Sequence, residues 1–258
     1  MGLRRFFSIL RMDNRGMRMA IDKKRNLLSL DLSNRMKHIV KYGPFKGMKL
    51  SQENWWGSHD RASMLLGIYE KEVLESMMTI SKKRDVFVDL GAADGYYSIG
   101  TLISRRFKKS YSFEISSKGR DIIQKNAILN HVNNKLEIFG EATKDFYKHI
   151  PTNHLNKAVI LIDIEGGEFN LLDKGVFESL KRSIIFVEIH EWFFLDGEKK
   201  LKKLLNDAKL YFKISTLTTS SRDLSVYPEL SSLIDSDRWL IASEGRARLM
   251  TWLRLDPI

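Results

Sequence analysis

Apolar residues recur along the chain with two spacings, one typical of helices and one typical of buried strands. From Arg61 to about Ile80 they fall at helical intervals, which predicts an amphipathic helix. From Val86 onward, short apolar runs alternate with helical stretches. The pattern predicts strands over 86–90, 111–115, 135–139, 158–164, 183–189, 211–217 and 238–243, and helices over 96–107, 121–130, 168–180 (broken at Gly175) and 199–208. Such alternation is typical of an α/β fold with a mostly parallel sheet and helices on both faces.

The composition fits a folded globular chain. The protein has 258 residues, of which 43% are hydrophobic and 29% charged, and it contains only 4 prolines. No segment of 20–50 residues repeats, so solenoids and propellers are excluded. The absence of cysteine excludes disulfide scaffolds, zinc fingers, iron–sulfur sites and thiol nucleophiles. Any metal ion must therefore bind to oxygen or imidazole.

The net charge of +11 lies almost entirely at the N-terminus. Residues 1–49 carry 13 Lys and Arg against 3 acidic residues, whereas residues 50–258 are close to neutral. We therefore divide the chain into a basic N-terminal arm (1–49) and a catalytic domain (50–258) with a helical lead-in (50–84). We expect the arm to contribute little to the fold and to offer a contact with an anionic membrane surface or polyanion.

The first residues contain a basic and apolar stretch that includes Arg4, Arg5, Phe6 and Phe7. Its apolar run is too short to span a bilayer, and it has neither the apolar core nor the cleavage site of a signal peptide. We therefore expect a cytoplasmic protein, peripheral to the membrane at most.

Candidate chemistry gathers where the predicted strands end, which is where open α/β sheets bind ligands. The first strand runs into Asp89-Leu-Gly-Ala-Ala-Asp-Gly95, a glycine-containing turn before a helix. Glycines let the backbone approach a ligand closely. The two carboxylates suit a cationic or hydroxyl-rich ligand better than a phosphate, which makes Asp89, Gly91, Ala92, Asp94 and Gly95 candidate cofactor ligands.

The next two strand ends each supply an acidic residue. Glu114 follows Asp89 by 25 residues, at the place where an acid accepts hydrogen bonds from ribose hydroxyls in nucleotide-binding βαβ units. Glu141 and Ala142 follow the third strand, where Glu141 could accept a hydrogen bond from an adenine amino group.

The fourth strand ends in Ile162-Asp-Ile-Glu-Gly-Gly-Glu168, which holds three carboxylates. Crowded carboxylates repel one another unless a proton, a metal or a ligand lies among them. The following strand ends in Glu188 and His190, which share one face because strands have a period of two. Asp163, Glu188 and His190 are thus candidate catalytic residues, and the same three could hold Mg²⁺ or Mn²⁺.

These stretches resemble those of class I S-adenosylmethionine (SAM)-dependent methyltransferases of the FkbM type. The resemblance covers residues 85 to about 191 and rests on Phe87–Ser98, Phe113-Glu114, Ile162–Glu168 and Val187–His190. It implies a Rossmann-like, seven-stranded sheet whose last strand is antiparallel. It also implies methylation of a hydroxyl group, typically on a sugar, glycan or secondary metabolite.

The resemblance implies roles for individual residues. Asp89, Gly91 and Gly95 cradle the methionine part of SAM, Glu114 binds its ribose, Glu141 lies by the adenine, and Asp163 faces the methyl group and the acceptor. The acceptor must lose a proton, for which His190 is a candidate base. A metal held by Asp163 and Glu188 could acidify the acceptor instead.

Two other enzyme classes remain as alternatives. A nicotinamide-dependent oxidoreductase would share the fold, but the turn lacks G-x-G-x-x-G and its acids disfavour a pyrophosphate. A nucleic-acid methyltransferase could use the basic arm. Enzymes that methylate exocyclic base amines usually carry an Asp- or Asn-Pro-Pro-aromatic run at the fourth strand end, whereas here Asp163 precedes Ile-Glu-Gly.

Overall fold

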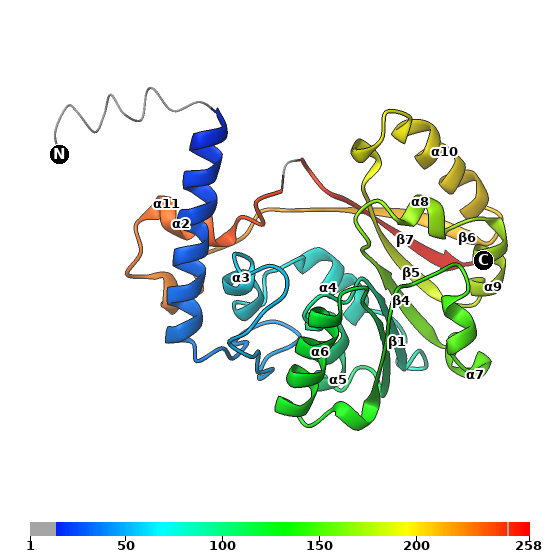
Figure 1. Ribbon diagram of the computed structural model, residues 1–258, viewed down its shortest axis with the longest axis horizontal. Coiled ribbons are helices and arrows are strands. Elements are labelled where there is room, and N and C mark those ends of the chain that lie inside the picture. The colour runs from blue at the N-terminus through cyan, green and yellow to red at the C-terminus, as the bar shows by residue number, and fades with distance from the viewer. Residues whose placement is uncertain (1–13, 247) are drawn as a thin grey trace.

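The computed structural model describes residues 14–246 and 248–258 (Figure 1). The strands are β1 (Val86–Leu90), β2 (Lys109–Phe113), β3 (Leu136–Phe139), β4 (Ala158–Ile162), β5 (Ile184–Ile189), β6 (Phe212–Thr218) and β7 (Thr251–Pro257). The helices are α2 (Asn14–Arg35), α3 (Arg61–Leu65), α4 (Lys71–Met78), α5 (Tyr96–Ile103), α6 (Ser117–Leu129), α7 (Thr152–Leu155), α8 (Glu168–Leu171), α9 (Lys174–Leu180), α10 (Gly197–Ala208) and α11 (Asp235–Ala242). Short 3₁₀ turns are η1 (Asn133–Lys135), η2 (Phe146–His149), η3 (Glu191–Phe193) and η4 (Pro228–Leu230).

The seven strands form one sheet in the order β3-β2-β1-β4-β5-β7-β6. Strands β1 to β5 pair in parallel, and β7 runs antiparallel to both of its neighbours. The order reverses between β1 and β4, which is where open α/β sheets bind ligands. The α/β class and the seven-stranded, Rossmann-like arrangement with an antiparallel last strand are therefore confirmed.

Both faces of the central strands are buried, as expected when helices cover a parallel sheet on each side. All five residues of β1 and of β4 are buried. On one face, Phe87 and Val159 join a core with residues of α4, α5 and α6; on the other, Val88 and Ile160 join a core with residues of α9 and α10.

Three elements differ from the sequence-based prediction. The helix predicted over 168–180 breaks at residues 172–173, between α8 and α9, and Gly175 lies within α9. Residues 61–80 form α3 and α4 rather than one helix, because the chain turns at Gly67, where a Cβ atom would lie 2.3 Å from the carbonyl oxygen of Tyr42. Residues 238–243 were predicted as a strand but lie largely within helix α11. Asp235 and Asp237 in its first turn favour a helix N-terminus. The last strand is β7 instead.

The segment called the basic arm is only partly separate from the body. Residues 1–13 lie outside the described residues. Helix α2 packs against α3 and α11, and Leu32, Phe45 and Met48 are fully buried in the core. The expectation that residues 1–49 contribute little to the fold is therefore wrong for the second half of this segment.

Over the described ranges 14–246 and 248–258, helices are either too short or too polar to cross a membrane.

Candidate active site

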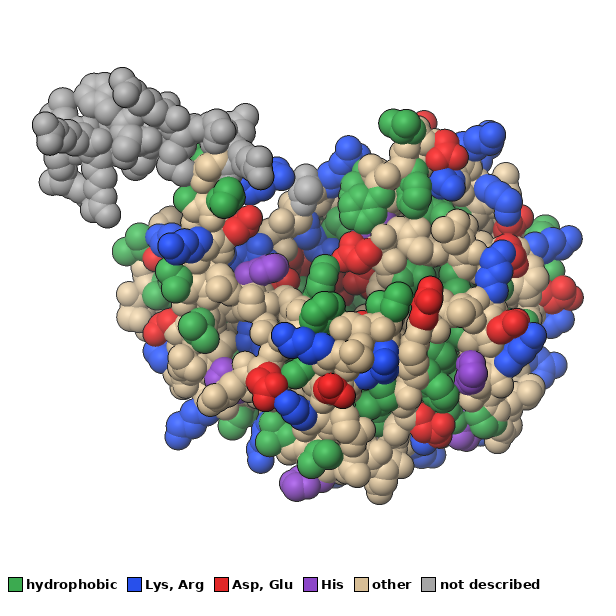
Figure 2. Space-filling view, viewed as in Figure 1, with side chains coloured by type: hydrophobic (Ala, Val, Ile, Leu, Met, Phe, Trp, Pro, Cys, Tyr) green, Lys and Arg blue, Asp and Glu red, His purple; other side chains and the backbone are tan. Residues whose placement is uncertain are grey.

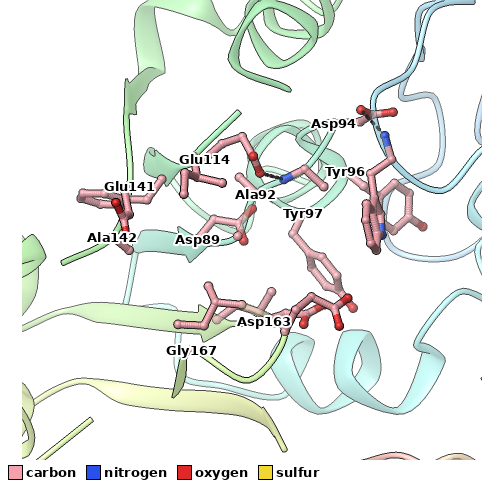
Figure 3. A pocket seen from close by; sticks show the side chains of 18 of the residues that line it. Asp89, Ala92, Asp94, Tyr96, Tyr97, Glu114, Glu141, Ala142, Asp163 and Gly167 are labelled. Carbon is pink, nitrogen blue, oxygen red and sulfur yellow. Dashed lines mark hydrogen bonds between the residues drawn. The ribbon is translucent and has the colours of Figure 1, made fainter. Parts of the chain in front are cut away.

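A cavity of about 610 Å³ opens at the carboxyl ends of β1, β2, β3 and β4 (Figure 3). Eight of the predicted site residues line it together: Asp89, Gly91, Ala92, Asp94, Glu114, Glu141, Ala142 and Asp163. Gly95, Glu188 and His190 are not among the lining residues. In the space-filling view, acidic side chains gather in a hollow near the middle of the molecule (Figure 2).

The turn after β1 brings the backbone of two strand ends into contact. Gly91 has φ +89°, and a Cβ atom there would lie 1.8 Å from the carbonyl oxygen of Asp163. Gly95, with φ +80°, caps the start of α5 and packs against Ile99. Both positions need glycine, since an L side chain rarely adopts this conformation and has no room here.

Asp94 holds the wall of the cavity in place. Its Oδ1 accepts hydrogen bonds from the backbone N–H groups of Trp55 (2.7 Å) and Trp56 (3.2 Å), and Arg61 donates to Oδ2 (3.4 Å). This carboxylate is therefore engaged with the Trp55-Trp56 turn, which carries two half-exposed indole rings at the cavity.

Glu114 sits at the end of β2, with its carboxylate bonded to two backbone amides. The N–H of Ala93 donates to Oε2 at 2.8 Å (Figure 3). The N–H of Ser116 donates to Oε1, also at 2.8 Å. Ala93 adopts a left-handed conformation (φ 49°) in this turn. These bonds fix the carboxylate while leaving lone pairs for two hydroxyl groups of a ligand.

Asp89 is almost fully buried at the floor of the cavity. Its Oδ2 accepts a hydrogen bond from Ser98 (2.5 Å), whose hydroxyl in turn accepts one from Ser112 (2.6 Å). Burial, reinforced by the charge of Asp163, raises the pKa of Asp89 to about 7. A cation bound beside it would favour its ionised form.

At the third strand end, Glu141 is exposed and Ala142 is half-buried. Both lie on the same side of the cavity as Glu114 (Figure 3), and Lys144 also lines it.

The ends of β4 and β5 hold the cluster of acids and imidazole that the sequence predicted. His190 Nε2 lies 3.7 Å from Asp163 Oδ1, 3.6 Å from Glu165 Oε2 and 3.5 Å from Glu188 Oε2. Asp163 reaches into the cavity, whereas His190 lies behind it with only 2% of its surface exposed. Asp163 Oδ1 is buried and has no hydrogen-bond partner among residues 14–246 and 248–258.

Glu168 orients the imidazole. This fully buried carboxylate accepts the backbone N–H of His190 (2.8 Å) and lies 3.3 Å from its Nδ1, while its other oxygen accepts the N–H of Gly166 (2.9 Å). A hydrogen on Nδ1 directed at Glu168 leaves Nε2 facing the other carboxylates. Burial lowers the pKa of His190, but the bond to Glu168 and the charges of Asp163 and Glu165 outweigh it, so the pKa is raised overall.

Arg246 and Glu70 belong to this cluster, although sequence reasoning did not find them. The guanidinium of Arg246 donates to Glu70, to Glu188 and, at 2.7 Å, to Glu244. Burial raises the pKa of Glu70 to about 7 and raises that of Glu188 further, with Arg246 opposing both shifts. Residues 70, 188 and 246 lie far apart in the sequence, in no recognisable motif, so only the fold reveals the contact.

Two sets of side chains could hold a metal ion. Ligand atoms of Asp163, Glu165 and His190 lie within 4.8 Å of one another, and so do those of Glu70, Asp163 and Glu188. The predicted trio of Asp163, Glu188 and His190 is thus divided between the two sets. Their oxygen-rich donors suit Mg²⁺ or Mn²⁺.

No protein-family model and no curated protein matches this chain. Its fold is similar to those of several solved structures. One is the m1A22 tRNA methyltransferase TrmK of B. subtilis (7% identity over 70% of this chain and 64% of that one, TM-score 0.47). Others are the precorrin-6y C5,15-methyltransferase of Geobacter metallireducens (11%, 70% and 85%, TM-score 0.44) and TYW2 of M. jannaschii in complex with AdoMet (16%, 75% and 77%, TM-score 0.44). At these identities the similarity concerns the fold.

Proposed function

We propose that the protein is a SAM-dependent methyltransferase of the FkbM type that its motifs resemble, acting on a hydroxyl group of a sugar, glycan or secondary metabolite. The observation that carries the proposal is the convergence of Asp89, Glu114 and Asp163 on one cavity, beside a glycine turn closed to any side chain at position 91. A cationic, hydroxyl-bearing ligand matches these carboxylates, whereas a pyrophosphate would be repelled by them.

The half of the cavity at β1 and β2 fits the cofactor. The backbone around Gly91 and the carboxylate of Asp89 would hold the methionine part, because its ammonium group is attracted to an ionised acid. Glu114 would accept hydrogen bonds from the ribose hydroxyls through its free lone pairs. Glu141 and Ala142, at the rim next to Glu114, would lie by the adenine.

The half at β4 and β5 fits the acceptor. Bound SAM supplies a methyl group on a sulfonium, open to in-line attack by an oxygen nucleophile. Asp163 lines the cavity together with Glu70 and Glu165 of its cluster. Directly after β4, it would position the acceptor hydroxyl and accept its proton as the new O–C bond forms. His190, held by Glu168 behind Asp163, would balance the negative charge, a role that suits its raised pKa.

A divalent ion is the alternative way to activate the acceptor. Asp163, Glu165 and His190 offer a donor set for Mg²⁺ or Mn²⁺, and an ion there would lower the pKa of a bound hydroxyl. The buried Asp163 Oδ1, which has no hydrogen-bond partner within the described part of the chain, could accept such an ion.

Isothermal titration of the purified protein with SAM, S-adenosylhomocysteine and NAD tests the cofactor class. We expect both SAM and S-adenosylhomocysteine to bind and NAD not to. Binding of NAD alone would replace this proposal with an oxidoreductase.

Methyl transfer to a panel of hydroxyl acceptors, with and without a chelator, then tests the reaction. We expect Asp163→Ala and His190→Ala each to lower turnover by about 100-fold or more, at the lower end of general acid–base contributions. Full turnover in both variants would remove the cluster from the reaction. Loss of turnover on chelation, with SAM binding intact, would favour the metal.

A further inference from the structure

Helix α2 packs against the protein through Leu28 and Leu32 and also through polar side chains, while several of its other apolar side chains are exposed. Surface helices normally turn their apolar side chains toward the protein and their polar ones outward. On α2, the inward positions include Arg25, Ser29 and Ser33, which are buried. Leu27 and Leu30 point outward and are 57% and 54% exposed.

Hydrogen bonds explain how a polar face can pack against the protein. Arg25 forms a buried ion pair with Asp60. The hydroxyl of Ser29 donates to the carbonyl of Ser58 (2.8 Å) and accepts from the N–H of Ala62 (3.0 Å). The inner face of α2 is therefore satisfied by the body of the protein without using these outward apolar side chains.

The outer face combines apolar and basic side chains in one stripe. Met19, Lys23, Leu27 and Leu30 follow one another at spacings of four, four and three residues, which places them on one side of a helix. Met19 is 65% exposed, and Lys23 and Lys24 are exposed too. We call Met19, Lys23, Leu27 and Leu30 the α2 stripe. The helix stands at one side of the molecule, away from the sheet (Figure 1), where both hydrophobic and basic side chains reach the surface (Figure 2).

We propose that the α2 stripe is a docking surface for an anionic lipid bilayer. An amphipathic helix that lies in a membrane interface places apolar side chains at the acyl boundary and Lys or Arg near anionic headgroups. The rest of residues 1–49 adds to the positive charge, which totals 13 basic against 3 acidic side chains. Lys23 would add an attraction that salt screens, whereas Lys24 is already paired with Asp237.

The same stripe fits two other occupants less well. A nucleic acid would pair with the lysines but leave Met19, Leu27 and Leu30 exposed to water. A second copy of the chain that used this stripe symmetrically would bring Lys23 close to its own counterpart, and like charges repel. An anionic bilayer, which is apolar beneath its charged headgroups, matches both the apolar side chains and Lys23.

Vesicle flotation of the full-length protein tests the proposal. We expect binding to phosphatidylcholine vesicles that contain phosphatidylglycerol, little binding to phosphatidylcholine alone, and about a tenfold or greater loss between low and high salt. The triple variant Met19→Ser, Leu27→Ser, Leu30→Ser should lose about tenfold in partitioning, because the stripe then lacks apolar contacts.

The matched control is Ile128→Ser, Leu210→Ser, Val226→Ser, which removes side chains of similar exposure (54%, 52% and 57%) from other elements. It should bind vesicles like the wild type. The proposal is overturned if both triple variants bind alike, or if the wild type does not bind anionic vesicles. It is equally overturned if the stripe variant loses a dimer detected by ultracentrifugation or an affinity for RNA while vesicle binding is unchanged. Circular dichroism and thermal unfolding in parallel show that each variant is folded.

Discussion

The half of the cavity at β1 and β2 and the half at β4 and β5 differ in the groups that surround their carboxylates. At the ends of β1 and β2, the acids are mainly bonded to neutral donors: Ser98 on Asp89, and backbone amides on Glu114. At the ends of β4 and β5, the acids crowd around a histidine and an arginine, and one oxygen of Asp163 has no hydrogen-bond partner among the residues that the structure describes. The first half is a preformed cradle, which suits recognition. The second is a set of coupled charges, which suits proton movement or ion binding.

Substitution of Gly91, where the ends of β1 and β4 meet, should cause the largest loss of stability. In Gly91→Ala, the new methyl group would overlap the carbonyl oxygen of Asp163 in a conformation that L residues rarely adopt. We expect a loss of about 4 kcal/mol or more in the free energy of unfolding, or no folded protein at all. Chemical denaturation measures it.

Gly140→Ala is the matched control, since a Cβ atom at Gly140 meets nothing within 4 Å. It should change the free energy of unfolding by no more than about 0.5 kcal/mol. Equal effects in the two variants would mean that the ends of β1 and β4 are not in close contact.

Removing the guanidinium of Arg246 tests how the charges at the ends of β4 and β5 contribute to stability. Arg246→Met leaves Glu70 and Glu188 buried without their counter-charge, which typically costs about 3–5 kcal/mol of stability. Both acids have pKa values raised by folding, so the folded state holds protons that the unfolded state releases as the pH rises above about 4.5. The variant should therefore be most destabilised at alkaline pH and least near pH 5.

Thermal unfolding across this pH range measures the effect. The triple variant Glu70→Gln, Glu188→Gln, Arg246→Met should recover part of the loss, because neutral side chains need no counter-charge. A pH-independent penalty would indicate that Arg246 acts through packing alone.

The half of the cavity at β1 and β2 should determine the affinity for SAM. Glu114→Ala removes the proposed ribose acceptor and should weaken SAM binding by about 1.5–3 kcal/mol, the range for hydrogen bonds to a charged group. Titration calorimetry measures it. Glu137→Ala, an exposed acid on β3, is the control and should bind SAM normally. If Glu114→Ala bound SAM as tightly as the wild type, Glu114 would not be the ribose acceptor.

The smallest effect we expect is a pH dependence of cofactor affinity. A cationic ligand favours ionised Asp89, whose pKa is raised to about 7, so binding below that pH releases a proton. SAM affinity should rise with pH, by up to about tenfold per unit, and level off above about pH 7. Asp89→Asn should flatten the profile. If the SAM affinity of the wild type did not change with pH, the ionisation of Asp89 would not be coupled to SAM binding.

Some features of this protein follow from local sequence. The strand-and-helix alternation depends on side-chain period alone, and it placed β1 to β6 within a few residues. Because the carboxyl ends of parallel strands meet at one edge, Asp89, Glu114, Glu141 and Asp163 could be assigned to one cavity before any coordinates were known. Gly91 was expected to let the backbone approach a ligand, whereas the close approach in the structure is to the backbone carbonyl of Asp163.

Other features were decided only by tertiary structure. The sequence placed His190 on the same face as Glu188, but burial behind Asp163 depends on how β4 and β5 pack. Arg246 reaches Glu70 across 176 residues, and no local pattern encodes such a contact. From the sequence alone, the polar residues of α2 suggest a helix exposed to solvent. The structure shows instead that Arg25 pairs with Asp60 and that Ser29 bonds to the carbonyl of Ser58. The spacing of apolar residues indicates which side of a helix or strand is buried. The partners of charged and polar side chains depend on which distant segments the fold brings together.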